Sequence, residues 1–230
     1  MIVFIHVERT AGSSIHSWFH PANVPTLQDR SWVLSGADLS QIAQAKAAPR
    51  PAYLAGHFGL ADLDAAGFAP SDIRVLFAVT RDPVERAISL YALMRRSPDW
   101  LPHIAPSVGD RDFEYFYEFC RDRGYYFPND QCRRIGGSAS FSATRSIIMK
   151  RYSFVGSSDR IDLVASALRS RLSDILPGFS APSVRLNGAK YGNDEIALSK
   201  RMEAKVEDDE SEDAQLHRFI VEEDGLYSRS

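Results

Sequence analysis

The chain has little of several features that mark special classes of protein. It has only two cysteines in 230 residues, Cys120 and Cys132, which argues against a disulfide scaffold or a cysteine-rich metal site. We expect both to be free thiols, with a bridge between them as the alternative. The net charge of −3 gives no general attraction to nucleic acid, so any anion site must be built locally. No ligand cluster stands out, and we expect no metal.

Long apolar segments are also lacking. No run is long enough to span a bilayer, and the N-terminus has neither the basic region nor the cleavage site of a signal peptide. We therefore expect a cytoplasmic protein without a membrane span. The chain does have a hydrophobic content of 44% over 230 residues, which is enough to bury a full core. We expect a single domain over residues 1–230.

A polar turn near the N-terminus follows a predicted buried strand at residues 2–5 (IVFI). A helical pattern begins after it, near Ile15. Such a turn places free backbone N–H groups at a helix N-terminus, where an anion is favoured. Gly12 would let a phosphate approach the backbone, and Arg9 would add a fixed cation. Hydroxyl donors in the turn are Thr10, Ser13 and Ser14. The turn is not a Walker A loop, because it lacks the spacing and the lysine; a plain strand–helix connection is the alternative.

A second strand-to-helix junction follows residues 74–80 (RVLFAVT), a predicted buried strand. The next residues are typical of an N-cap, a first helical position and a capping box: Asp82, Pro83 and Glu85. The face expected to point inward carries Val84, Ile88 and Tyr91. Arg81 lies at the carboxyl end of the strand, where open α/β sheets bind ligands. Together with Ser89 it would grip a second phosphate; a simple ion pair of Arg81 with a carboxylate is the alternative.

The remaining pattern predicts strands that alternate with helices, which indicates a largely parallel α/β sheet. Further strands are predicted near residues 52–54 and 151–156. Helices are predicted at 37–47, 112–123, 161–172 and within 193–221. The aromatic residues of the 112–123 helix are expected in the core. Residues 97–110, rich in proline and glycine, predict a loop over the site, and the acidic run 207–210 predicts a solvated face.

The two junctions together resemble the phosphate-binding elements of PAPS-dependent sulfotransferases, most closely the carbohydrate, heparan 2-O-sulfotransferase-like group with bacterial members. Residues 6–14 (HVERTAGSS) resemble the family's 5′-phosphosulfate loop, roughly His-Ile-Pro-Lys-Thr-Ala/Gly-Gly-Thr/Ser-Ser. Residues 80–91 (TRDPVERAISLY) resemble its 3′-phosphate element. Weaker echoes follow in the family's order at residues 56–59 (GHFG), 129–133 (NDQCR), 152–156 (YSFVG) and 213–216. The resemblance implies a P-loop-like three-layer fold, with a central, mainly parallel sheet flanked by helices.

The resemblance also implies a reaction: PAPS donates a sulfuryl group to an acceptor hydroxyl, expected on a carbohydrate, and PAP is released. The residues implied to hold the 5′-phosphosulfate are Arg9, Thr10, Ala11, Gly12, Ser13 and Ser14. Those implied to hold the 3′-phosphate are Arg81 and Ser89, with Arg185 and Lys190 of a late basic loop as further candidates. The displacement would be in line and assisted by a histidine base.

The first motif departs from the family pattern at two positions. Arg9 stands where the family has lysine, so it can neutralise charge on the departing phosphate but cannot donate a proton near neutral pH. Glu8 stands where the family has proline and would bring a negative charge to a phosphate site. We expect its side chain to point away and to pair with an arginine.

His57 is the candidate base, because its residue type titrates near neutral pH and its turn matches the family region that supplies a histidine. Bracing of the turn is the alternative. His6 is expected to be buried and hydrogen-bonded. His16 and His20 are minor candidates near the acceptor, whereas His103 and His217 are expected on the surface.

Two other functions stay open from the sequence. A non-catalytic protein of the same fold could bind PAP or a glycan, and Arg9 in place of lysine favours it. A nucleotide phosphotransferase would need a metal-binding acid, and the missing Walker lysine argues against it.

Overall fold

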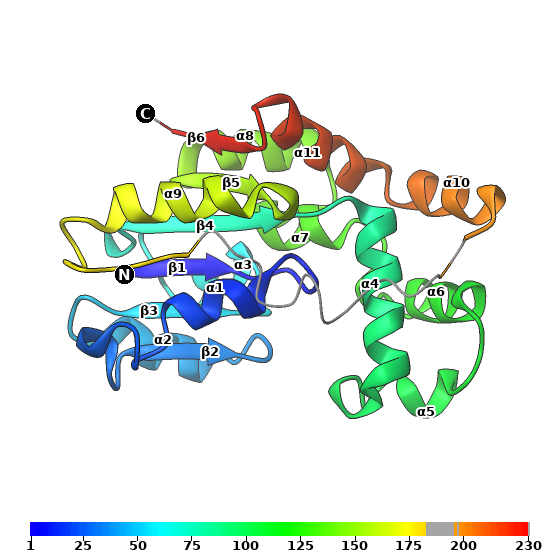
Figure 1. Ribbon diagram of the computed structural model, residues 1–230, viewed down its shortest axis with the longest axis horizontal. Coiled ribbons are helices and arrows are strands. Elements are labelled where there is room, and N and C mark those ends of the chain that lie inside the picture. Colours follow the sequence, from blue (N-terminus) through cyan, green and yellow to red (C-terminus); the bar gives the residue numbers. More distant parts are fainter. Residues whose placement is uncertain (183–195, 197, 230) are drawn as a thin grey trace.

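The protein is described by a computed structural model that covers residues 1–182, 196 and 198–229. Its centre is a six-stranded sheet in the order β2-β3-β1-β4-β5-β6 (Figure 1). The strands are β1 (Ile2–Ile5), β2 (Ser31–Leu34), β3 (Tyr53–Gly56), β4 (Val75–Thr80), β5 (Phe154–Ser157) and β6 (Leu226–Ser228). Neighbours among β1 to β5 are parallel, and β6 is antiparallel to β5. The predicted α/β fold with a central, mainly parallel sheet is confirmed, and it is consistent with a three-layer P-loop-like fold.

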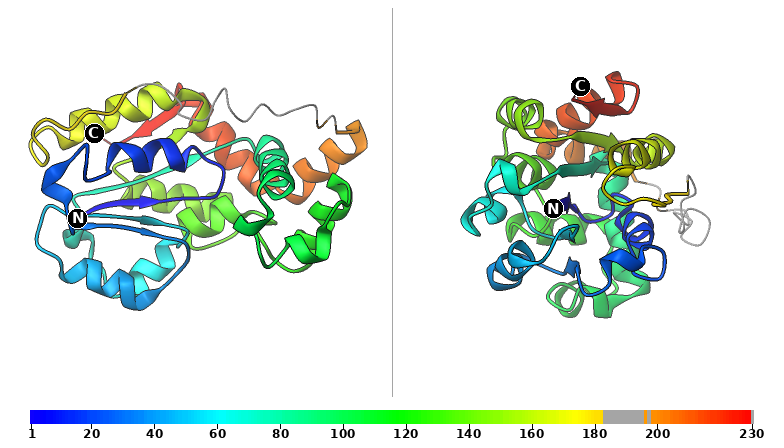
Figure 2. Two further views of the ribbon diagram at one scale, coloured as in Figure 1. Left: turned by 60° about the horizontal axis from the view of Figure 1, so that its bottom comes forward. Right: turned by 90° about the vertical axis from the view of Figure 1, so that its left-hand side faces the viewer.

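The sheet is buried on both faces, which explains why β1, β3 and β4 are continuous apolar runs in the sequence. One face is covered by α1 (Gly12–Trp18) and α9 (Ile161–Leu172) (Figure 2). The other face is covered by α2 (Leu39–Ala47), α3 (Leu60–Ala65), α7 (Asp130–Gly136), α8 (Phe141–Arg151) and α11 (Ser211–Glu222). Alternate strand residues point to opposite faces, so Ile2 and Phe4 pack under α1 while Val3 and Ile5 pack on the other side.

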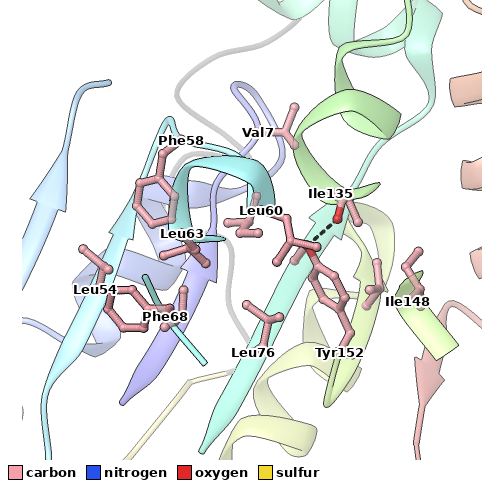
Figure 3. Packing of buried hydrophobic residues seen from close by; sticks show 14 of the residues in the cluster. Val7, Leu54, Phe58, Leu60, Leu63, Phe68, Leu76, Ile135, Ile148 and Tyr152 are labelled. Atoms are coloured by element: carbon pink, nitrogen blue, oxygen red, sulfur yellow. Dashed lines mark hydrogen bonds between the residues drawn. The ribbon is translucent and has the colours of Figure 1, made fainter. Parts of the chain in front are cut away.

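Figure 3 shows the packing on the second face, where aromatic and aliphatic side chains close the space between the sheet and α3, α7 and α8. Phe58, Leu63 and Leu76 are buried there. The Tyr152 hydroxyl is also buried and donates a 2.8 Å hydrogen bond to the Ile135 carbonyl. A buried hydroxyl needs such a partner, so Tyr152 serves the core.

A second group of helices lies beyond the carboxyl ends of the strands (Figure 1). It contains α4 (Pro83–Arg96), α5 (Ala105–Val108), α6 (Phe113–Asp122) and α10 (Lys200–Asp209), and it has its own apolar cluster. The expected core role of the aromatic residues on α6 is confirmed, since Phe113, Phe116 and Tyr117 are buried in this cluster. Short 3₁₀ helices are η1 (Pro25–Leu27), η2 (Pro70–Asp72), η3 (Pro98–Trp100) and η4 (Ser158–Arg160).

The predicted loop over the site at residues 97–110 is wrong. This segment contains η3 and α5, and Leu101, Ile104 and Val108 are buried against α4 and α6. Pro98 and Pro106 lie in the first two positions of η3 and α5, where proline is tolerated, and do not mark an open loop.

The predicted inward face of α4 packs on the apolar cluster as expected, but the buried surface of the helix is wider than predicted. Tyr91 is buried, but Val84 and Ile88 are only half-buried, whereas the polar residues Arg86 and Ser89 are among the most buried. The spacing of apolar residues cannot predict that polar side chains such as Arg86 and Ser89 are buried, because their burial depends on partners elsewhere in the chain.

A buried charge cluster around Arg86 joins these helices. The guanidinium is fully buried and lies 3.8 Å from Asp130 and 3.9 Å from Glu210. It also donates a 2.6 Å hydrogen bond to the Tyr126 carbonyl and lies over the Phe127 ring. The solvated face predicted for the acidic run 207–210 is therefore wrong for Glu210. Its carboxylate is buried because it meets a buried cation, and a lone buried carboxylate would be costly.

Asp213, on α11, ties the same cluster to α7. It accepts backbone hydrogen bonds from Gln131 at 2.9 Å and from Cys132 at 2.7 Å, both in the first turn of α7. Glu210 accepts one from the Asn129 backbone at 2.9 Å. The two carboxylates therefore fix the start of α7, which lies against the ends of the sheet strands.

Glu210 makes stability depend on pH in a defined direction. Burial raises its pKa from 4.5 to about 7. A carboxyl group with a raised folded-state pKa stabilises the fold while it is protonated, and this contribution is lost as the pH rises from 4.5 to about 7. Glu210→Gln removes this titration. We expect the free energy of unfolding of the variant, relative to the wild type, to rise with pH over this range in chemical denaturation.

The exposed neighbour Glu207 provides the control, as Glu207→Gln should give a difference that is nearly independent of pH. A Glu210→Gln difference that stays flat or falls with pH would contradict this account of the cluster.

Candidate functional site

The order of the sheet strands places the candidate site. From β1 the chain passes to β2 and β3 on one side of the sheet, and from β4 it passes to β5 on the other. The carboxyl ends of β1 and β4 are therefore adjacent at the point where the connections diverge. Ligands of open α/β sheets bind at such a point. Both predicted phosphate-binding junctions begin there, one after Ile5 and the other after Thr80.

The structure brings the central residues of the two junctions into contact. Arg9 Nε donates a 2.9 Å hydrogen bond to the Ser89 hydroxyl, across a sequence separation of 80 residues. Arg81 Nη1 lies 3.4 Å from the Arg9 carbonyl oxygen. Ser89 is buried on α4. The Arg9 guanidinium thus meets the Ser89 hydroxyl, and the Arg81 guanidinium lies against the Arg9 backbone, so two cations are present at this edge of the sheet, where an anion is favoured.

Hydrogen bonds to its backbone hold Arg81 in place. The Gln131 side chain accepts from the Arg81 N–H at 2.9 Å and donates to the Arg81 carbonyl at 2.9 Å. Asp82 caps α4 as predicted, through a 3.0 Å bond from the Glu85 N–H. The Glu85 carboxylate pairs with Arg81 Nε at 3.2 Å. The ion pair considered as the alternative for Arg81 is thus present together with the contact to Arg9, and Glu85 is half-exposed.

The turn after β1 has an unusual backbone. Arg9 and Ala11 have φ values of 69° and 68°, in the left-handed region that residues with a side chain seldom adopt. The Thr10 hydroxyl, predicted as a phosphate donor, donates instead to the Val7 carbonyl at 2.8 Å and stabilises the turn. Helix α1 begins at Gly12, earlier than predicted, and has only seven residues. Its dipole adds little, so the positive charge of this edge comes from the arginines. Ser14 is buried, while Ser13 is exposed.

Gly12 has a different role from the predicted one. A Cβ atom on this residue would lie 1.9 Å from His6 Nε2. The imidazole of His6 therefore occupies the space that a side chain at this position would need. Glycine is needed here because a ring is packed directly on the first residue of the helix.

His6 belongs to a cluster of aromatic side chains. His6 and His57 directly follow β1 and β3, His16 lies on α1, and Tyr53 is the first residue of β3. His6 Nδ1 and His16 Nε2 are 3.1 Å apart, and His16 Nδ1 lies 3.1 Å from the Tyr53 hydroxyl. The ring centroids of His6 and His57 are 4.4 Å apart. Burial lowers the pKa of His16 to about 4 and that of His6 well below 6.5. Both rings are thus neutral at pH 7, and the predicted hydrogen-bonded role of His6 is confirmed.

His57 faces a carboxylate. Its Nδ1 lies 3.2 Å from Glu8 Oε1 and 3.1 Å from the His6 carbonyl oxygen. The same Glu8 oxygen lies 3.1 Å from Arg134 Nη2. The predicted arginine partner of Glu8 therefore exists, and Glu8 is directed to Arg134 and His57 and not to Ser89, a side-chain partner of Arg9. Glu8, His57 and Arg134 belong to three segments that are far apart in the sequence. The local sequence therefore could not have indicated the Glu8–His57 pair.

The other residues singled out from the sequence fall into three groups: some lie outside the described residues, some are exposed and some are buried. Arg185 and Lys190 lie outside the described residues. His103 and His20 are exposed, and His103 was predicted so. The prediction of a surface position for His217 is wrong, because its ring is buried and its Nδ1 lies 3.2 Å from the Thr80 hydroxyl. Cys120 and Cys132 are free and buried, and burial raises the pKa of Cys120 to about 12.

Two features are absent from the part of the chain that the structure describes. In that part of the chain, no group of three histidine, cysteine, aspartate or glutamate residues is arranged to hold a metal ion. None of its helices has the length and apolar character required to cross a membrane. No known protein-family model matches the chain, and no curated protein matches it in sequence. The arrangement of Arg9, Arg81, Ser89 and the Glu8–His57 pair is therefore the basis for any assignment.

Gly12→Ala tests the packing of His6 on α1. Alanine normally favours a helix over glycine, but here the new methyl group overlaps the imidazole. We expect the substitution to lower the free energy of unfolding by about 1–3 kcal/mol. His6→Ala should remove most of this penalty, giving a favourable coupling in a double-mutant cycle.

Gly36 is the matched control, since nothing lies within 4 Å of a Cβ placed there. Gly36→Ala should change stability by less than about 0.5 kcal/mol. Equal effects at the two glycines, or additive effects of the His6 and Gly12 substitutions, would contradict the proposed packing.

Proposed function

We propose that this protein is a PAPS-dependent sulfotransferase that transfers a sulfuryl group to a hydroxyl group, with a carbohydrate as the expected acceptor. The observation that carries the proposal is the contact between Arg9 and Ser89, with Arg81 beside them, at the point where the sheet connections diverge. The proposal is supported because the two sequence segments that resemble the family's 5′- and 3′-phosphate elements are in contact at one edge of the sheet.

The residues present fit a donor with two separate phosphate groups. Arg9 belongs to the turn after β1, and Arg81 to the junction after β4, so the cations come from different strands and can serve different phosphates. Ser89 is buried on α4 and accepts from Arg9, so it is available as a hydroxyl partner at this edge. In this arrangement Arg9 would hold the 5′-phosphosulfate, and Arg81 with Ser89 the 3′-phosphate. Gly12 and Thr10 are already engaged by His6 and Val7, so they support the turn.

The bound donor would supply the sulfuryl group and leave with the electron pair of the broken bond between sulfur and the bridging phosphate oxygen. Arg9 stabilises the negative charge that develops on that phosphate, and being always protonated it keeps its cation throughout. His57 takes the proton of the acceptor hydroxyl as the new oxygen–sulfur bond forms. Its ring is partly exposed, with a side-chain accessibility of 26%, so the proton can pass to water afterwards.

Arg81→Ala tests the 3′-phosphate role. Loss of one charge-assisted contact of about 1.5–3 kcal/mol should weaken PAP binding by roughly 10- to 100-fold in calorimetric titration. Arg95→Ala is the control, because Arg95 lies at the far end of the same helix and pairs with Asp110 on the surface. An unchanged affinity in Arg81→Ala, or equal losses in both variants, would overturn the assignment.

His57→Ala tests the base. We expect turnover of PAPS with a panel of glycan acceptors to fall by about 10²- to 10⁴-fold, because a general base contributes on that scale. PAP affinity should stay within twofold of the wild type, since His57 does not hold the nucleotide. His103→Ala, at an exposed histidine, should retain activity. A wild-type protein that binds PAP without sulfating any acceptor would instead indicate a non-catalytic binding protein.

A further inference from the structure

We propose that Glu8 is the positioning residue of His57: its carboxylate lies beside Nδ1 of the ring, which is hydrogen-bonded to the His6 carbonyl, and together the two oxygens keep the proton on Nδ1 and leave Nε2 as the basic nitrogen. The inference deepens the proposed function and rests on it for the role of His57 as a base. The assignment of the tautomer rests on geometry alone and holds for the free protein.

The surroundings of Nδ1 determine which ring nitrogen carries the proton. Two oxygen acceptors face it, Glu8 Oε1 at 3.2 Å and the His6 carbonyl at 3.1 Å. Neither oxygen can donate, because one belongs to a carboxylate and the other to a peptide. A lone pair on Nδ1 would therefore face two other lone pairs. The neutral ring must be protonated at Nδ1, which leaves the lone pair on Nε2.

Glu8 is itself held from the opposite side. Arg134 Nη2 lies 3.1 Å from the same carboxylate oxygen, and Arg134 Nε donates to Asp130 at 3.0 Å. Asp130 in turn lies 3.8 Å from the buried Arg86. The alternating charges connect His57 to the cluster that joins α4, α7 and α11. Glu8 is also only 13% exposed, so it cannot swing freely into solvent.

A positioned carboxylate also stabilises the product of proton transfer. When the acceptor proton arrives at Nε2, the ring carries two N–H groups and a positive charge, and Glu8 is adjacent to that charge. The other ionisable groups around the pair cannot take this role. They are the neutral rings of His6 and His16, the cation of Arg134 and the phenol of Tyr126.

The family-like proline at this position would supply no such partner. Glu8 instead lies in a turn whose next residue, Arg9, has a left-handed backbone. This turn directs Glu8 toward His57 and Arg134 on one side and Arg9 toward Ser89 on the other. The residue that departs from the family pattern therefore serves the candidate base, while its neighbour serves the phosphate edge.

The direct test is the tautomer of His57, measured from histidine ring ¹⁵N shifts in the free protein at a pH where the ring is neutral, with His57→Ala to assign the signals. We expect the wild type to be protonated at Nδ1 with an unprotonated Nε2. Glu8→Ala should increase the population protonated at Nε2, since one of the two acceptors at Nδ1 is gone. Asp64→Asn, which breaks a 2.8 Å ion pair with Arg151 that involves no histidine, should leave the spectrum unchanged.

A wild-type His57 protonated at Nε2, or an unchanged tautomer in Glu8→Ala, would overturn the proposal. If Glu8→Ala does not fold, Glu8→Met replaces it: its side chain has a similar volume but no strong hydrogen-bond acceptor, so the same population change is expected. In kinetics, Glu8→Gln should lower kcat by at least about tenfold with KM for PAPS and PAP affinity unchanged. An unchanged kcat would also overturn it.

PAP binding and the tautomer of His57 can fail independently of each other. Wild-type protein that fails to bind PAP would remove the proposed function, yet the tautomer experiment would still decide whether Glu8 positions His57. Conversely, PAP binding with an Nε2-protonated His57 would leave the donor site intact and remove only the role of Glu8.

Discussion

The adjacency of the β1 and β4 carboxyl ends is the constraint on which the rest of the site depends. Parallel strands need crossover connections, and these place every strand-to-helix turn at one edge of the sheet. Because the connections diverge between β1 and β4, the turn that carries Arg9 and the junction that carries Arg81 meet there, although many residues separate them in sequence. The contact between Arg9 and Ser89 follows from this topology, since α4 begins directly at the end of β4.

A second constraint is the burial of Arg86, which organises the acidic side of the site. A buried guanidinium requires carboxylate partners, and these come from α7 and from the junction of α10 and α11. The alternation of charges continues through Asp130 and Arg134 to Glu8 and ends at His57. Positive charge therefore gathers at the β1–β4 edge, and a carboxylate faces the candidate base. This division suits a reaction that must hold a polyanion and remove a proton at neighbouring positions.

Local pattern was enough to predict much of this fold. The apolar runs of β1 and β4, the cap formed by Asp82, and helix α9 depend on neighbouring residues alone, and the structure places them as predicted. Other features depend on contacts between distant segments. Glu210 is buried because it lies beside Arg86. Gly12 is covered by the ring of His6, and Glu8 is positioned by its contacts with His57 and Arg134. Sequence spacing carries no signal for such pairs.

We propose that Arg81 and Ser89 form a site for a phosphate on the 3′ position of a nucleotide. Calorimetric titration of the wild-type protein with PAP, with AMP and ATP as controls, tests it most directly. The account predicts that PAP binds at least about tenfold more tightly than AMP, because only PAP carries the phosphate that Arg81 would meet. Equal affinities for PAP and AMP, or a preference for ATP, would contradict it.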